Sequence, residues 1–135
     1  MEFLVASALL LLPVIYLVLV LGRLQAATFA AEGAAREAGR SFTTAATVDA
    51  ATARAVASVR IALNDQGFDA VDAASALDLT CSTTPCLEPG SDVTVRVAFD
   101  VALPAVPAFV QAVVPLAIPV SATNVAPVDE FRVTP

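Results

Sequence analysis

The sequence predicts an α+β protein in which a long N-terminal α-helix, apolar in its first half, carries a small C-terminal antiparallel β head. Residues 1–22 are almost unbroken hydrocarbon, and residues 23–63 are rich in Ala, the best helix former. From residue 91 onward, apolar and polar side chains alternate with a period of two, which is typical of a strand with one buried face. The 135 residues leave room for one small domain of roughly a hundred residues behind the apolar run.

The opening segment, MEFLVASALLLLPVIYLVLVLGR, is long enough to cross a bilayer as a helix. At 1.5 Å per residue, about twenty residues span roughly 30 Å, the thickness of the hydrocarbon core. A cleaved signal peptide is disfavoured because no cation precedes Arg23 and the run is too long. A plain single-pass anchor fits the length. The favoured interpretation is a helix that first sits in the membrane and then packs against copies of itself in a filament core.

Two residues of this segment are candidate weak points of the helix. Pro13 removes a backbone donor, which costs a soluble helix about 3 kcal/mol, although helices in lipid tolerate a bend. Gly22 ends the apolar run just before Arg23. These residues form either an ordinary kink in a membrane helix or a place where the helix melts and stretches as it leaves the bilayer.

The Ala-rich segment over residues 23–63 is expected to continue the same helix as its outer half. Two Glu–Arg pairs at helical spacing support it: Glu32 with Arg36, and Glu37 with Arg40. Gly33 and Gly39 each weaken it by about 1 kcal/mol relative to Ala. The sequence therefore predicts one helix over about residues 2–63, roughly 90 Å long.

Residues 64–90 are a connecting region that opens with a helix stop, because Asn64 and Gly67 form a typical C-cap signal. Three acids follow at spacings of four and three residues: Asp65, Asp69 and Asp72. A calcium loop would need a denser oxygen pattern and a bidentate Glu at its end. The three are interpreted as solvated acids at a helix end, and no metal site is predicted.

The motif CSTTPC in this region predicts a disulfide between Cys81 and Cys86. With no His in the chain, two cysteines do not complete a tetrahedral zinc site, and a redox motif would have two intervening residues rather than four. A disulfide indicates an oxidising compartment. We therefore expect the part of the chain after the apolar run to lie outside the cytoplasm.

Residues 91–135 are expected to form the β head. In SDVTVRVAFDVAL the odd positions from Val93 to Leu103 are apolar, which predicts a strand with one buried face. A second strand is expected over about residues 116–126, at a sheet edge because of its prolines. Two or three antiparallel strands are expected to pack on the outer part of the long helix.

The segment between these strands, residues 104–115, is rich in proline and is expected to be a loop with a short helical turn at about 107–113. Its larger apolar side chains include Phe109, Val110 and Val113. They could contact lipid or a neighbouring subunit, or they could cover the sheet. The sequence leaves these alternatives open.

The charge balance argues against several classes of function. Seven Arg and 13 acids give a net charge of −6. Up to Arg60, five Arg face four acids, while beyond it two Arg face nine acids, so the acidity lies in the C-terminal domain and disfavours nucleic-acid binding. The chain contains no His, no GxSxG motif and no Gly-rich phosphate loop. The sequence therefore predicts neither an enzyme nor a cofactor site.

A family resemblance covers about residues 2–40. Glu2-Phe3 before the apolar run, the internal Pro13, the Gly22-Arg23 exit and the stretch AATFAAEGAAREAGR resemble the TadE/TadG-like pseudopilins of Tad (tight adherence, Flp) pili, especially actinobacterial members. The resemblance implies a pilin-like fold and a homo-oligomeric helical filament, or co-assembly with other pilins. It also implies a prepilin peptidase and a membrane assembly platform as partners.

In such a system, the precursor sits in the cytoplasmic membrane with its N-terminus inside and its head outside, and then enters an extracellular, cell-surface pilus. The pilus would serve adhesion, motility or DNA uptake. The alternative is a single-pass envelope protein that stays in the membrane as part of a pilus-assembly or secretion machine.

Glu2 is the candidate registry residue of such a filament. Burying an unpaired carboxylate in an apolar core costs several kcal/mol, so a filament core would need a cation beside it. No Lys or Arg lies near Glu2 in the sequence. The family pattern suggests that its partner is the free N-terminal amine of an adjacent subunit.

Overall fold

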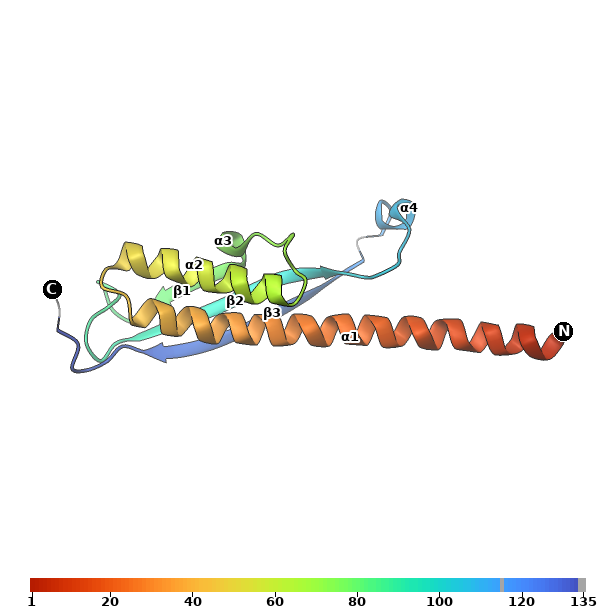
Figure 1. Cartoon of the computed structure of the whole chain (residues 1–135). Helices are drawn as coiled ribbons and strands as arrows, with labels where there is room; N and C mark the ends of the chain where they lie inside the picture. The colour runs from red at the N-terminus through yellow and green to blue at the C-terminus, as the bar shows by residue number, and fades with distance from the viewer. Residues whose placement is uncertain (115, 134–135) are drawn as a thin grey trace.

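The computed structural model describes residues 1–114 and 116–133, so Pro115 and the last two residues of the predicted head lie outside the described residues. It confirms the predicted α+β class: a long N-terminal helix carries a small three-stranded antiparallel sheet (Figure 1). The elements in chain order are α1 (Glu2–Thr43), α2 (Val48–Asp65), α3 (Ala73–Ala76), β1 (Leu77–Cys81), β2 (Asp92–Ala102), α4 (Ala108–Gln111) and β3 (Ala117–Pro127).

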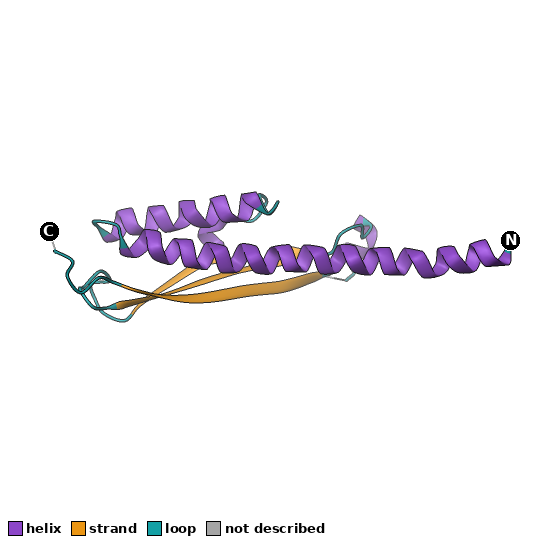
Figure 2. Ribbon diagram, turned by 60° about the horizontal axis from the view of Figure 1, so that its bottom comes forward, coloured by secondary structure: helices purple, strands orange, loops and turns teal. Residues whose placement is uncertain are grey.

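The prediction of one helix over residues 2–63 is wrong, because the chain turns back after Thr43. The 42 residues of α1 form a rod of about 63 Å rather than 90 Å, and α2 lies alongside its second half (Figures 1 and 2). Thr44 donates its hydroxyl to the Arg40 carbonyl at 2.9 Å, and Thr47 caps α2 by accepting from the Ala50 N–H at 3.2 Å. Hydroxyl side chains compete with helical hydrogen bonds in this way, and they end one helix and start the next.

The helix pair is held by small side chains. On α1, the buried residues that follow the exit from the apolar run are almost all Ala, with Gly39 and Phe42 near the end. On α2 the buried positions recur every four residues: Ala51, Ala55, Val59 and Leu63. This spacing places them on one face of α2. Because most of the buried side chains between the two helices are small, the two backbones approach closely.

The sheet has the order β1-β2-β3, with both pairs antiparallel. The strand predicted from Val93 onward is β2, and the second predicted strand is β3, which lies at a sheet edge as expected. Strand β1 was not predicted. Its five residues, LDLTC, are too short for a clear alternation, and they pair with β2 from Leu77 opposite Val97 to Cys81 opposite Val93.

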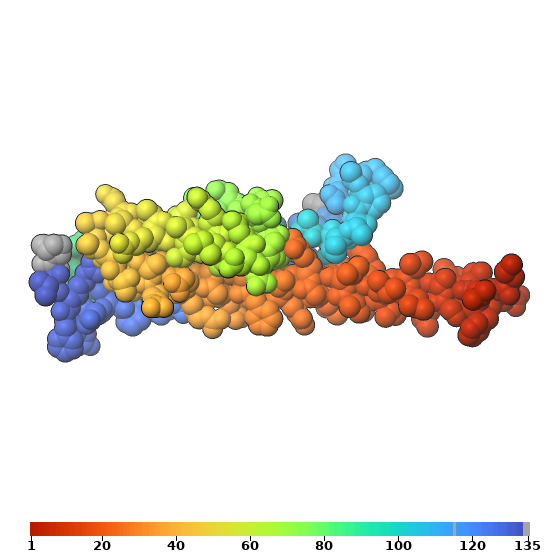
Figure 3. Space-filling view, viewed as in Figure 1, coloured from red at the N-terminus to blue at the C-terminus, as the bar shows by residue number. Residues whose placement is uncertain are grey.

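The hydrophobic core lies between the helix pair and one face of the sheet (Figure 2). The large side chains that are fully buried there come from both layers and from the C-terminal segment: Phe42, Leu63, Val59, Val93, Val95, Val97 and Val128. The first half of α1 takes no part in this core. It projects from the head as a bare rod (Figure 3).

Candidate functional site

The apolar half of α1 is the clearest functional surface of the described chain. It is long and apolar enough to cross a membrane, and none of its most apolar 18-residue window is buried. Its large side chains are exposed along the whole rod, from Phe3 at 81% to Leu21 at 50%. Such a continuous apolar surface marks a contact with lipid or protein. The segment is therefore a candidate membrane anchor.

Glu2 lies in the first turn of α1, at the exposed tip of this rod. The one ion pair among the described residues joins Arg36 to Glu32 at 3.5 Å, so Glu2 has no ionic partner in the part of its own chain that the structure describes. Along the helix, Arg23 is about 30 Å away at 1.5 Å per residue. The registry role of Glu2 stays a prediction.

Pro13 and Gly22 both lie inside α1, which runs unbroken through them. A side chain at Gly22 would meet nothing within 4 Å, so no packing contact requires glycine there. The continuous helix shows no break at either position. Melting on transfer out of the bilayer stays a prediction.

Arg23 fastens the end of the head that adjoins the apolar rod. Its Nη2 donates to the Gly67 carbonyl at 3.1 Å, and its guanidinium lies 4.1 Å from the ring centroid of Phe68. The Phe68 ring in turn packs on Phe99 of β2, with centroids 5.3 Å apart. Sequence reasoning treated Arg23 only as the end of the apolar run. It missed that this cation joins α1 to the segment after α2.

The predicted C-cap at Asn64 and Gly67 positions this contact. The N–H of Gly67 donates to the Asn64 carbonyl at 3.0 Å, and the N–H of Phe68 donates to the Leu63 carbonyl at 2.9 Å. These two bonds form a Schellman motif, and Gly67 has the positive φ of 77° that the motif requires. A hydrophobic residue directly after such a glycine was the available signal for Phe68.

Arg132 fastens the opposite end of the head. Its guanidinium donates to the carbonyl of Thr43 at 2.9 Å, to that of Ala46 at 3.1 Å and to that of Ala45. The last carbonyls of a helix lack partners within the helix, and a fork of N–H donors suits them. The C-terminal segment thus closes over the turn between α1 and α2. No local sequence signal assigns this role to Arg132.

The predicted disulfide is confirmed, with the Cys81 and Cys86 sulfurs 2.05 Å apart. It closes the loop after β1, and the following residue Leu87 shares a small cavity with the turn between α1 and α2. The disulfide therefore lies in the part of the head remote from the apolar rod. This placement agrees with a head on the oxidising side of a membrane.

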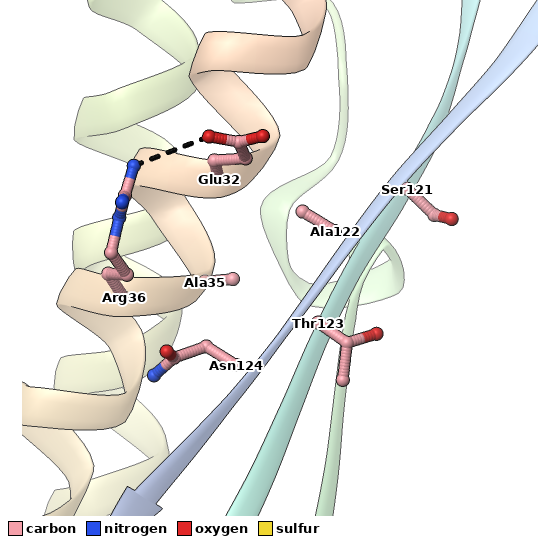
Figure 4. A pocket seen from close by; sticks show the side chains of 7 residues that line it. All are labelled: Glu32, Ala35, Arg36, Ser121, Ala122, Thr123 and Asn124. Carbon is pink, nitrogen blue, oxygen red and sulfur yellow. Dashed lines mark hydrogen bonds and ion pairs between the residues drawn. The ribbon is translucent and has the colours of Figure 1, made fainter.

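A polar groove of about 270 Å³ runs between α1 and the edge strand β3 (Figure 4). Glu32 and Arg36 pair with each other on one wall, and Asn124 points toward α1 from the other. Over the described residues, no group of three His, Cys, Asp or Glu side chains is placed to hold a metal ion. The groove presents one neutralised ion pair and no activated nucleophile, so it offers no basis for assigning catalysis.

Comparison of the chain with protein-family models, with curated proteins and with solved structures gives no match. The resemblance to Tad pseudopilins therefore stays an expectation from the sequence.

Proposed function

We propose that this chain is a pilin or pseudopilin, a structural subunit that assembles through its N-terminal helix into an extracellular type IV-like (Tad) pilus filament. Such a filament serves adhesion, motility or DNA uptake. The observation that carries the proposal is the continuity of α1: its first half is bare and apolar, and its second half forms one layer of the head core. A membrane anchor alone does not require this rigid connection, whereas a helical polymer does, because each head must hold a fixed position relative to the packed helices.

Hydrophobic energetics support assembly in two stages. Each large apolar side chain left in water forgoes about 1.5 to 3 kcal/mol, and the rod from Phe3 to Leu21 exposes more than a dozen of them. Lipid covers the rod in the precursor, and the rods of neighbouring copies cover it in the filament. The core of the head is complete without the rod and lies outside the apolar bilayer interior in both stages.

Glu2 sets the register between subunits in this proposal. In the membrane stage it lies in water at the cytoplasmic surface. In the filament it enters a core of apolar helices, where an unpaired carboxylate costs several kcal/mol. The N-terminal amine of the adjacent subunit is the partner that the resemblance suggests, and this pairing allows only one axial offset between neighbours.

The disulfide supports the membrane orientation. The Cys81–Cys86 bond lies in the head and persists in an oxidising compartment. With α1 as the span, the N-terminus is inside and the head outside. A prepilin peptidase and an assembly platform in the same membrane would process and extrude the subunit.

The second candidate function is a single-pass envelope protein that stays in the membrane within a pilus-assembly or secretion machine. It accounts equally well for one contact: Arg23 fastens the head directly at the end of a span of about 30 Å. This arrangement suits a lone protein standing on a bilayer as well as it suits a precursor.

The test is the variant Glu2→Gln, expressed in the native host in place of the original chain. The matched control is Glu37→Gln, which neutralises an exposed acid on the head half of α1. Electron microscopy of sheared surface fractions counts filaments, and mass spectrometry identifies the N-terminus of the chain in them. We expect Glu2→Gln to reach the membrane at normal levels and to lose most filaments, while the control keeps them. Intact monomer found only in the membrane, for the original chain as well, would favour the second candidate.

A further inference from the structure

The connection between β2 and β3 forms an exposed apolar projection, which we call the β2–β3 tip (residues 103–114 and 116). It contains no charged residue, and Gln111 is its only polar side chain. Three of its large side chains are exposed: Phe109 at 74%, Val113 at 81% and Val114 at 46%. An uncharged cluster of this kind at the end of a hairpin marks an interaction surface.

The Gln111 side chain and five backbone N–H groups of the tip are paired within the tip. The Gln111 side-chain amide donates to the Val106 carbonyl at 2.9 Å. The backbone N–H groups from Val110 to Val114 donate to carbonyls of the same turn, at distances of 2.9 to 3.2 Å. Backbone that enters an apolar medium must satisfy its hydrogen bonds internally. The tip meets this requirement along the turn that carries its exposed apolar side chains.

The tip lies at the same height along α1 as the C-terminal end of the apolar rod, where the rod joins the head (Figures 1 and 2). A Cβ built on Gly39 would lie 2.9 Å from Ala126 Cβ. Strand β3 therefore packs against α1 at the height of Gly39. From Ala126 back to Ala117, nine residues of strand span about 30 Å. The same distance along α1 is about twenty residues, which leads from Gly39 to about residue 19. The tip extends from that level, beside the rod and separate from it (Figure 3).

We infer that the β2–β3 tip inserts into the interfacial layer of the outer leaflet while α1 spans the bilayer, so that the protein holds the membrane at two points. The inference rests on α1 crossing a membrane, which both candidate functions share, and not on filament assembly. Lipid is the occupant because the tip stands at the depth of the membrane boundary set by α1 and, like residues 3–22 of the rod, contains no charged residue. Two contacts with α1 hold the tip at that depth. Arg23 packs on Phe68, which packs on Phe99 of β2, and β3 lies against α1 at Gly39.

The test uses the full-length chain, one copy per nanodisc of phosphatidylcholine and phosphatidylglycerol, with the Cys81–Cys86 disulfide intact. An environment-sensitive fluorophore is attached at Val113→Cys, and lipids with a nitroxide near the top of the acyl chain serve as quencher. The matched control is Ser121→Cys, which lies exposed on β3. We expect several-fold stronger quenching at Val113 than at Ser121. Adding Phe109→Asp should reduce the quenching at Val113 to the control level while the hydrogen exchange of β2 is unchanged.

A third probe, at Val18→Cys, reports whether α1 itself is in the bilayer. Quenching at Val18 without quenching at Val113 overturns the inference and leaves the membrane span intact. If the Val113 probe becomes shielded only in filaments, a second copy rather than lipid covers the tip, and the inference is wrong. Failure to quench at Val18 removes the membrane span and the inference together. Loss of filaments in Glu2→Gln affects none of these readings, because each nanodisc holds a single copy.

Discussion

The close approach of β3 to α1 at Gly39 gives the sharpest test of the fold. A Cβ at Gly39 would lie 2.9 Å from Ala126 Cβ and 3.1 Å from Asn124 Nδ2. Because Ala126 Cβ is attached directly to the backbone, the contact is relieved only if β3 moves. At Gly33, six residues earlier on the same helix, an added Cβ meets nothing within 4 Å.

These two glycines should therefore respond to alanine with opposite signs. Ala gains up to about 1 kcal/mol over Gly inside a helix, so Gly33→Ala is expected to stabilise the head by about 0.5 to 1 kcal/mol. At Gly39 the same gain is opposed by overpacking of about 1 to 3 kcal/mol. Gly39→Ala should be neutral to destabilising by about 2 kcal/mol, and the gap between the two variants should be about 1 to 3 kcal/mol.

The assay is native-state hydrogen exchange of the full-length chain in detergent micelles, read by mass spectrometry on peptides from β2 and α2. Where exchange follows opening of the head, the rate rises tenfold for each 1.4 kcal/mol lost. We expect β2 peptides to exchange more slowly in Gly33→Ala and faster in Gly39→Ala. If Gly39→Ala protects β2 as well as Gly33→Ala does, β3 does not pack on α1 at this height, and the depth assigned to the β2–β3 tip loses its basis.

Two further predictions concern other contacts of the head. Arg132→Lys keeps the charge but loses the fork of donors that reaches three carbonyls, so the free energy of unfolding of the head should fall by about 1 to 2 kcal/mol in the same exchange assay. The control Arg54→Lys, at an exposed arginine, should change it little. Equal effects of the two variants would contradict the capping role of Arg132. Hydrogen bonds from Ser75 lower the pKa of Asp72 below its ordinary value of 3.8, so the cap of α3 stabilises the fold above that pH and is lost as pH falls through the lower, folded-state pKa. After correction for the pH dependence of intrinsic amide exchange, acidification should lower the protection of the α3 amides in the original chain but not in Asp72→Asn, whose side chain does not titrate. The same loss of protection in both would refute this assignment.

The sequence predicted the elements whose signals are local. The apolar run, the alternation in β2 and the Gly67 cap each specify their structure within a few residues, and the structure contains all three. The turn after Thr43 was missed because Ala-rich helix lies on both sides of it, so composition does not change across the break. The spaced hydroxyls of Thr44 and Thr47 were the only local sign, and their effect depends on what α2 can bury once it folds back.

The candidate site was predicted less completely, because its fastening contacts join residues far apart in the chain. Arg132 reaches carbonyls more than eighty residues earlier, and Arg23 reaches Gly67 across 44 positions. Neither partner is visible in a sequence window. Gly39 was treated as a weak point of a helix, whereas β3 approaches α1 so closely there that an added Cβ would lie 2.9 Å from Ala126 Cβ. Tertiary packing decides which residue such a position requires, and helix propensity carries no information about that packing.

The unbroken α1 makes the geometry of the apolar half inseparable from that of the head. Each residue of an α-helix adds a rotation of about 100° and a rise of 1.5 Å, so the direction and height of Glu2 relative to β3 are set by the count of residues between them. The contacts of Arg23 prevent the head from turning at the exit of the apolar run. An anchor that only tethers a domain gains nothing from this constraint. In a polymer, a fixed angle lets every copy present its carboxylate and its head to neighbours in the same way, and this supports a filament subunit over a solitary anchor.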